Sequence, residues 1–279
     1  MIHTSRQLKA LVRNLSKGDS VKAQTIIRNY VMERFLERLS LSQYKSNLIL
    51  KGGTLIAAMV GLDNRSTLDL DTTLKNMPLS ETSTRQIVGK IIGVQIDDGM
   101  TFEIKSVAPI MGESDYPGIR IMLDTTLETM RTPLKIDFSS GDVITPREVS
   151  YSFRLLFEER TISILAYNLE TVLAEKIETL LTRGTANTRM RDFYDIYVLT
   201  NSQAHNIDDT ILKSAFINTC EQRGSISLLP DADLILSEIS ENIVLIDLWK
   251  NYQRRFDYAS DVLWKDAMNA TKSLIEVVK

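Results

Sequence analysis

The pattern of the sequence changes near residue 165, and this change limits the possible fold more than any other feature. From residue 168 to the end, apolar residues recur at helical spacing, and glycine occurs only at Gly184 and Gly224. Asn168 has the side chain of a helix N-cap. We expect helices over 169–182, 188–200, 208–223, 231–248 and 257–277. The chain is therefore predicted to have two domains, 1–165 and 166–279, the second of them helical.

The first 165 residues combine helical and strand-like patterns. Two partly apolar helices are expected within 4–40, and they are expected to cover the domain that follows. Further helices are expected at 53–60 and 80–93. Strand-like runs at 102–110, 118–124 and 133–138, separated by turn-rich stretches such as 112–117, favour an antiparallel meander. The predicted class is α+β: a mixed sheet flanked by N-terminal helices and followed by a C-terminal helical bundle.

Composition limits the class of protein. A chain of 279 residues that is 43% hydrophobic can bury a sizeable core, and a net charge of −3 argues against a uniformly basic nucleic-acid coat. Cys220 is the only cysteine, so neither an internal disulfide nor a cysteine zinc site is expected. No signal peptide and no apolar run of about 18 residues is visible. We therefore expect a cytoplasmic protein that does not cross a membrane.

Asp69 and Asp71 are separated by a single residue. Read as a strand from 67 to 71, the segment places Thr67, Asp69 and Asp71 on one face, because side chains alternate with period two. Two carboxylates about 6.5 Å apart on one face can bind a pair of divalent cations through hard oxygen ligands. The alternative, a solvent-facing strand edge, leaves unexplained why two residues disfavoured in strands share a face.

A glycine pair lies upstream of the aspartates, at the expected start of a helix. The segment is Lys51-Gly52-Gly53-Thr54, and it offers unobstructed backbone N–H groups and one hydroxyl. Helix N-termini favour phosphate through their free donors and their dipole. Lys51 is expected to contact phosphate as well. The sequence thus predicts a nucleotide phosphate site next to a metal site.

Together these segments resemble the polymerase-β-like nucleotidyltransferase superfamily, and within it the AbiEii/AbiGii-type, MenT-like toxins. The resemblance rests on four elements in order, from the Gly-Gly turn to a late helical segment. They are 51–54, 65–71, the Ala-Glu-Lys element at 174–176 and the Arg-Asp-x-Tyr-Asp element at 191–195. The chain has Gly53-Thr54 where the family has Gly-Ser, which keeps the hydroxyl and leaves the choice of nucleotide open.

The resemblance implies a nucleotidyltransferase fold and a magnesium- or manganese-dependent transfer of a nucleoside monophosphate from an NTP to a hydroxyl. It implies a toxin of a toxin–antitoxin or abortive-infection phage-defence pair, restrained by a separately encoded antitoxin. On the same grounds GTP is a plausible donor and the tRNA 3′ end, which MenT toxins modify, is the first-choice acceptor. Two alternatives stay open: a protein or small-molecule acceptor, and a non-catalytic NTP-binding module.

A third carboxylate is expected to complete the metal site. Asp137 is the candidate, because it shares a strand face with Lys135 opposite the apolar Leu134, Ile136 and Phe138. It is expected to act as a metal ligand or as the general base that takes the acceptor's proton. The alternative is an ordinary solvated polar face.

Lys176 lies three residues after Leu173, on the flank of an apolar helical stripe. An ammonium there needs a carboxylate partner or an anionic ligand. One interpretation is an ion pair with Asp192 or Asp195 that connects two helices. The family resemblance favours the other, in which Lys176 contacts nucleotide phosphates and Asp192 is a further catalytic residue.

Several arginines are candidates for phosphate contacts. Arg65 precedes the aspartate motif and is expected, like Thr67, to lie at the nucleotide site. Arg183, Arg189 and Arg191 fall in a loop between two expected helices, where they can contact RNA phosphates without reading sequence. A solvated loop fits the same composition.

Overall fold

The computed structural model describes residues 1–110 and 118–279, so the turn expected at 112–117 lies outside the described residues. The chain forms two compact units. The first contains residues 1–62, 66–141 and 149–166, and the second contains 63–65, 142–148 and 167–279. None of the helices in the described ranges combines the length and apolarity needed to cross a bilayer.

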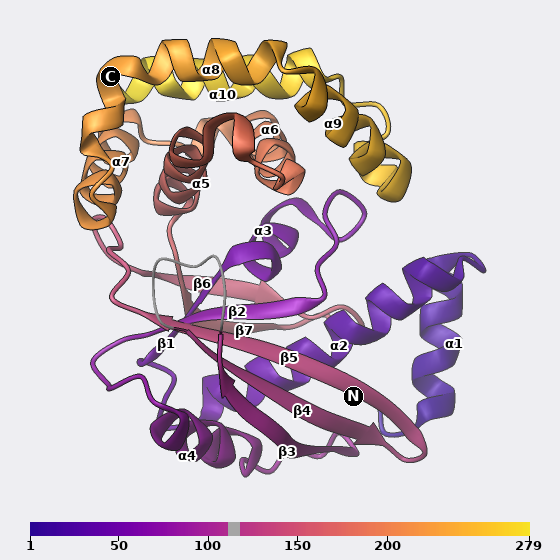
Figure 1. Cartoon of the computed structure of the whole chain (residues 1–279). Coiled ribbons are helices and arrows are strands. Elements are labelled where there is room, and N and C mark those ends of the chain that lie inside the picture. The colour runs from indigo at the N-terminus through magenta and orange to yellow at the C-terminus, as the bar shows by residue number, and fades with distance from the viewer. Residues whose placement is uncertain (111–117) are drawn as a thin grey trace. The chain divides into compact units, whose positions relative to one another are not determined.

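A mixed sheet is the centre of the first unit (Figure 1). Within the described residues it has seven strands in the order β3-β4-β5-β2-β1-β7-β6. The strands are β1 (Leu48–Lys51), β2 (Asp69–Leu74), β3 (Met100–Pro109), β4 (Ile119–Leu127), β5 (Met130–Ser140), β6 (Val149–Arg154) and β7 (Thr161–Ala166).

Strand pairing combines the expected meander with a central parallel pair. β3, β4 and β5 pair antiparallel in sequence order, as the strand-like runs predicted. β5 then pairs parallel with β2, which pairs antiparallel with β1. The hairpin of β6 and β7 was not predicted. The parallel pairing of β2 with β5 matters for function, because it brings together carboxylates far apart in the sequence.

The two faces of the central strands differ in chemistry. Leu70, Ile121 and Ile136 are all completely buried. Since side chains alternate along a strand, Asp71 and Asp137 lie on the opposite face. This polar face is where the predicted carboxylates project.

Helices pack against the strands of the sheet. α2 packs against β5 and β7, α4 packs against β3 and β4, and α3 packs against β1 and β2 (Figure 1). N-caps define their starts where the sequence offers them: Thr4 forms a capping box with Gln7, and Asp19 accepts from the first turn of α2. The helices are α1 (Ser5–Ser16), α2 (Ser20–Leu41), α3 (Gly52–Val60) and α4 (Glu81–Ile92).

α2 differs from the partly apolar helix expected from the sequence, because its charged side is also buried. Glu33, Arg34, Glu37 and Arg38 are each at most 4% exposed. Burying a charge is costly unless it is paired, and all four have partners. The N–H of Leu156 donates to Glu33, and the other three side chains form ion pairs with residues elsewhere in the unit.

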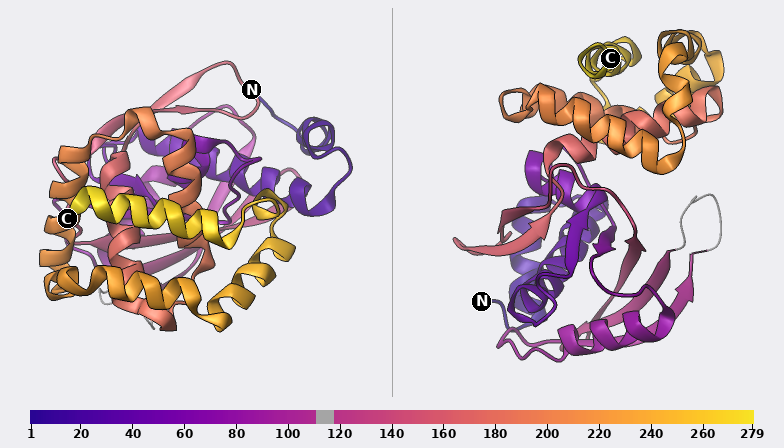
Figure 2. Two further views of the ribbon diagram at one scale, coloured as in Figure 1. Left: turned by 90° about the horizontal axis from the view of Figure 1, so that it is seen from above. Right: turned by 90° about the vertical axis from the view of Figure 1, so that its left-hand side faces the viewer.

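The second unit is helical throughout the described residues apart from its connecting segments (Figure 2). Its first helix begins at the predicted N-cap, since Asn168 accepts from the N–H of Thr171 at 2.9 Å. The helix expected over 231–248 is wrong, because Asn242 ends one helix and caps the next by accepting from Val244 and Leu245. The helices are α5 (Leu169–Arg183), α6 (Met190–Ser202), α7 (Asp209–Arg223), α8 (Ala232–Glu241), α9 (Ile243–Arg255) and α10 (Trp264–Val278).

The α+β class predicted from the sequence is therefore confirmed, with helices flanking a mixed sheet. The predicted domain boundary at 165/166 remains an expectation about independent domains. In the structure the short segments 63–65 and 142–148 belong to the second unit although they precede that boundary.

Candidate active site

The predicted carboxylates meet on two neighbouring strands of the first unit. In the parallel register of β2 and β5, Asp71 lies opposite Asp137, and Asp69 lies opposite Lys135. Neighbouring strands are about 4.8 Å apart, so the carboxylates of Asp71 and Asp137 share one small region of the polar face. The structure thus brings Asp69, Asp71 and Asp137 together.

The strand begins later than expected. β2 starts at Asp69 and not at residue 67, and Leu68, just before it, is 44% exposed. Thr67 is buried ahead of the strand, where its hydroxyl donates to the carbonyl of Asp69 at 3.3 Å. Thr67 therefore supports the start of the strand, and its predicted role at the nucleotide stays a prediction.

The Gly-Gly turn closes over Asp71. Gly52 has φ +65°, and a Cβ built on it would collide with the Asp71 carboxylate and come within 2.8 Å of the Asp71 Cβ. The backbone N–H of Gly53 donates to the same carboxylate. The absence of a side chain at Gly52 therefore leaves room for the Asp71 carboxylate beside the start of α3. Free N–H groups at a helix start favour negative charge.

Lys51 and Thr54 flank this turn. Lys51 ends β1 directly opposite Asp71, and its positive charge favours the ionised carboxylate. Thr54 is 3% exposed, and its hydroxyl donates to the carbonyl of Asp69 at 2.8 Å. That hydroxyl already has an acceptor within the protein. Its predicted contact with a nucleotide stays a prediction.

The surroundings of Asp71 disfavour the ionised form of its carboxylate. Burial raises the pKa of Asp71, and the nearby carboxylates of Asp137 and Asp69 raise it further. Lys51 and the Gly53 N–H oppose this effect without overcoming it. A cation bound here would relieve both the repulsion and the cost of burial.

Two basic side chains of the sheet partner the other carboxylates. Arg120 of β4 forms a bidentate pair with Asp137, with both N···O distances 2.8 Å. Lys135 of β5 lies 2.5 Å from Asp69 and 4.0 Å from Asp137, measured from its Nζ to a carboxylate oxygen. Neither residue was assigned a role from the sequence, although Lys135 was recognised on the face of Asp137.

The donor atoms fit a hard divalent cation. Three carboxylates on one face supply the oxygen ligands that Mg²⁺ and Mn²⁺ prefer. Within the described residues no group of three or more His, Cys, Asp or Glu side chains has the geometry of a metal site. The carboxylates of Asp69 and Asp137 form ion pairs with Lys135 and Arg120. The residues fit the metal in chemistry, and two of the three carboxylates are paired with basic side chains in the structure.

Lys176 and Asp192, the predicted site residues on α5 and α6, lie in the second unit and form an ion-pair cluster there. Lys176 of α5 lies 2.8 Å from Asp192 and 2.7 Å from Asp195, both on α6. Burial lowers the pKa of Lys176, but Asp192 and Asp195 outweigh burial and leave it raised. The ion pair between helices is therefore present in the structure. The phosphate-binding role of Lys176 and the catalytic role of Asp192 stay predictions.

Arg65 occupies a different environment from the one expected. It is 2% exposed and forms a close pair with Asp195, with N···O distances of 2.5 and 3.2 Å. Burial favours the protonated form of Asp195, yet Arg65 and Lys176 hold its pKa at about 2. Arg65 thus anchors the segment 63–65 to α6, both in the second unit, and its contact with phosphate stays a prediction.

The predicted RNA-binding arginines have varied surroundings. Arg189 is half-exposed and pairs with Asp192 at 2.9 Å. The guanidinium of Arg191 lies 5.2 Å from the centre of the Phe256 ring. Arg183 ends α5 and is partly exposed. Their contact with RNA stays a prediction.

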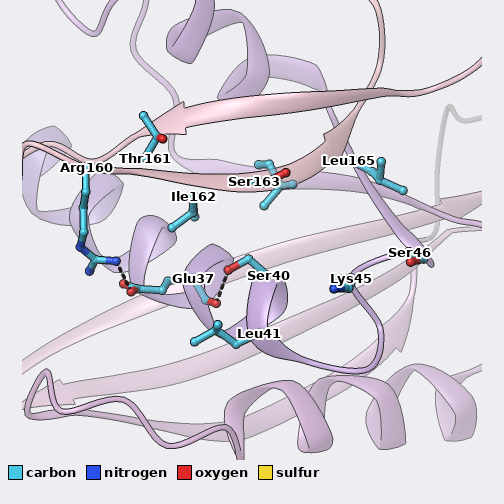
Figure 3. A pocket seen from close by; sticks show the side chains of 11 residues that line it. Glu37, Ser40, Leu41, Lys45, Ser46, Arg160, Thr161, Ile162, Ser163 and Leu165 are labelled. Carbon is cyan, nitrogen blue, oxygen red and sulfur yellow. Dashed lines mark hydrogen bonds and ion pairs between the residues drawn. The ribbon is translucent and has the colours of Figure 1, made fainter.

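A separate pocket of about 500 Å³ lies in the first unit between the end of α2 and β7 (Figure 3). Glu37 and Arg160 form an ion pair at one end, with an N···O distance of 2.5 Å. Ser163 and Lys45 lie on the strand and turn that line the rest. None of the predicted site residues lines this pocket, and its one carboxylate is already neutralised.

Comparison with known proteins assigns the family. The chain matches the family model described as nucleotidyl transferase AbiEii toxin, type IV toxin–antitoxin system, over residues 34–271. No curated protein matches the chain.

Solved structures show the same fold at low sequence identity. MenT4, a nucleotidyltransferase toxin from Mycobacterium tuberculosis, is 14% identical, with a TM-score of 0.56 over 97% of this chain and 99% of that chain. JHP933 from Helicobacter pylori is 16% identical, with a TM-score of 0.51 over 91% of this chain and 93% of that chain. With its carboxylate face and Gly-Gly turn inside the matched region, the chain belongs to the AbiEii family of nucleotidyltransferase toxins of type IV toxin–antitoxin systems.

Proposed function

We propose that the protein transfers a nucleoside monophosphate from an NTP to a hydroxyl of an RNA acceptor, with Asp69, Asp71 and Asp137 as the metal-binding carboxylates. The register that places Asp71 opposite Asp137, beneath the Gly52 turn, is the observation that carries the proposal. Two like charges opposite each other on neighbouring strands repel, and this repulsion disfavours the ionised form of Asp71. Their presence is explained if a divalent cation is the functional partner.

The reaction follows from this arrangement. The acceptor hydroxyl oxygen bonds to the α-phosphorus, the bond from that phosphorus to the pyrophosphate oxygen breaks, and the hydroxyl proton leaves to a base. Asp137 serves as a metal ligand or as that base, and Arg120 holds its carboxylate in place. Bound Mg²⁺ or Mn²⁺ would supply charge neutralisation for the attacking oxygen and the departing pyrophosphate.

Phosphate binding is proposed for the start of α3. The helix N-terminus provides backbone N–H groups at Gly52 and Gly53, and Lys51 adds a positive charge beside them. One of these donors, the N–H of Gly53, is shared with Asp71. Phosphate and metal sites would thus be adjacent, as transfer from an NTP requires.

The family resemblance extends the proposal beyond these residues. The antitoxin partner follows from the family. GTP as donor, the tRNA 3′ end as acceptor and a role in phage defence are proposed on that resemblance. The participation of Lys176 and Asp192 in transfer is proposed on the same basis, although their ion pair also supports a structural role.

The test is to incubate the protein with each labelled NTP, Mg²⁺ and either total tRNA or total protein. Label that appears on tRNA with the wild type and is lost with Asp69→Asn supports the proposal. Label found only on protein shows that the acceptor is a protein and not tRNA. Asp124→Asn is the matched control, because Asp124 lies on neighbouring β4 in an exposed ion pair with Lys105. If no NTP labels any acceptor, and Asp69→Asn keeps its effect on growth, the chain acts as a nucleotide-binding module instead.

A further inference from the structure

Lys135 is a basic residue that lies among the carboxylates of this face. Its Nζ lies 2.5 Å from Asp69 and 4.0 Å from Asp137, while Asp137 is the register partner of Asp71. The Lys135 side chain is 25% exposed, so it lies in the site and not on the open surface. Its position between carboxylates from two strands is the position that a bound cation would take.

We infer that Lys135 is a built-in counter-cation of this site: its ammonium neutralises the carboxylates of the metal-free protein and competes with the divalent cation for Asp69. This inference rests on the proposed function and adds a means by which the chain sets its own metal affinity. It concerns Lys135 itself, a residue to which neither the motifs nor the family resemblance assigned a role.

The competition follows from the geometry of the pair. A carboxylate oxygen in contact with an ammonium at 2.5 Å cannot at the same time approach a cation at the 2.0–2.6 Å typical of magnesium and calcium ligands without bringing two positive charges together. This oxygen of Asp69 therefore has to exchange one partner for the other. The side chain of Lys135 has a flexible four-carbon stem that permits this exchange.

Arg120 differs from Lys135 in this respect. Its planar guanidinium engages both oxygens of Asp137, and its side chain is 41% exposed at the margin of the site. A bidentate pair of this kind fixes the direction of a carboxylate. Lys135 makes a single contact to Asp69 from inside the site, so it can leave its carboxylate more readily than Arg120 can.

A competing role and a positioning role for Lys135 predict opposite signs. If Lys135 competes, its removal tightens metal binding, because Asp69 no longer has to be released. If Lys135 instead holds Asp69 in the metal-binding position, its removal weakens binding, because the carboxylate is free to turn away. The direction of the change is therefore the decisive measurement.

The experiment is calorimetric titration of the full chain with Mn²⁺, without nucleotide, for the wild type, Lys135→Met and Lys135→Gln. We expect Mn²⁺ to bind each variant about threefold more tightly than the wild type, since a partly exposed ion pair is worth about this factor. Lys105→Met is the matched control, because Lys105 pairs with Asp124 on the same sheet with both side chains exposed. Unchanged or weaker binding in both Lys135 variants overturns the inference.

Asp69→Asn separates this inference from the proposed function. If the wild type binds no Mn²⁺, or if Asp69→Asn binds it equally well, the metal-dependent function itself fails. If Asp69 is required but the Lys135 variants bind no more tightly, only the counter-cation role fails.

A measurement on Lys135 itself covers the case in which Lys135→Met and Lys135→Gln do not fold. Lysines labelled with ¹³C-methyl groups are followed by NMR, with the Lys135 signal assigned by its absence in Lys135→Arg. Addition of Mg²⁺ is expected to shift this signal and to leave that of Lys105 in place. A Lys135 signal that does not respond to Mg²⁺ overturns the inference.

Discussion

Asp71 lies directly opposite Asp137 in the parallel pairing of β2 with β5. The two carboxylates reach the same region from segments more than sixty residues apart, and burial together with this proximity raises the pKa of Asp71. Such a pair destabilises the metal-free fold unless basic groups or cations compensate for it. The residues around the pair therefore lead to the most direct predictions.

Gly52→Ala is expected to lower both stability and metal binding, because it adds a steric clash to the cost of backbone strain. Alanine disfavours the observed φ of +65°, which costs about 1 kcal/mol, and its methyl group would also collide with the Asp71 carboxylate. We expect the free energy of unfolding to fall by about 2 kcal/mol or more and Mn²⁺ binding to be lost. Chemical denaturation and calorimetry measure the two effects.

Gly141→Ala is the control for that substitution. Gly141 has φ +85°, and a Cβ there would have nothing within 4 Å. It should therefore show the cost of backbone strain with metal binding intact. Equal effects of the two substitutions would contradict the role assigned to Gly52.

Arg120→Met is expected to lower nucleotidyl transfer about tenfold, which corresponds to about 1.4 kcal/mol of lost transition-state stabilisation. The reason is that the bidentate pair fixes the direction of the Asp137 carboxylate. Arg120→Lys keeps the charge and should retain an intermediate rate, because lysine cannot form the fork. Initial rates at saturating Mg²⁺ measure the effect.

The matched control for Arg120 is Arg131→Met, an exposed arginine on the strand that carries Asp137. Its rate should equal that of the wild type. A rate for Arg120→Met that also equals the wild type would show that Asp137 needs no partner.

The sequence predicted the carboxylates because their signal is local. Alternation around Asp69, Asp71 and Asp137 places each of them on the polar side of a strand, and nothing in the fold overrides that pattern. The contacts of Arg120 and Lys135 with these carboxylates depend on strand order, since β5 becomes the neighbour of β2, and β4 the neighbour of β5, only in the folded sheet. A single sequence carries no direct signal for that order.

The missed elements have physical reasons too. The β6 and β7 hairpin alternates polar and apolar residues, a signal that the sequence does contain. The break at Asn242 depends on a side chain that caps α9, and an asparagine within an apolar helical pattern does not by itself reveal that function. The buried charges of α2 were unpredictable, because their partners lie on distant segments.

Glu33 is expected to make stability depend on pH. Burial raises the pKa of Glu33 to about 8, and the N–H of Leu156 and the charge of Arg34 oppose this only in part. Between about pH 4.5 and 8 the folded protein keeps the proton that the unfolded chain loses. The folded state therefore binds more protons in this range, and the contribution of Glu33 to the free energy of unfolding falls as pH rises.

Glu33→Gln tests this dependence because glutamine stays neutral. Relative to the wild type, the variant should gain stability between pH 5 and pH 8.5, by on the order of a few kcal/mol. Urea denaturation at the two pH values measures the gain. Glu103→Gln, at an exposed position of β3, is the control and should show no comparable change. If the difference in free energy of unfolding between Glu33→Gln and the wild type does not change with pH, Glu33 does not keep a proton in the folded state.

Among the buried charged residues of α2, Arg38 has the most complete set of partners, and its counter-charge is Asp98. Their bidentate contact has N···O distances of 2.7 and 2.9 Å, and Arg38 also donates to the carbonyls of Arg34 and Met100. Asp98→Ala leaves a buried guanidinium without its counter-charge. We expect it to lower the free energy of unfolding by about 3–5 kcal/mol.

A double-mutant cycle separates the cost of an unpaired charge from the value of the pair. Arg38→Met with Asp98→Ala should be less destabilising than the sum of the single substitutions, because neither charge is then left buried alone. Asp124→Ala, which breaks the exposed pair with Lys105, should change stability by less than about 1 kcal/mol. Strict additivity for Arg38 and Asp98 in urea denaturation at pH 7 would show that α2 does not depend on this pair, and that the packing of Arg38 against the Phe102 ring holds the helix instead.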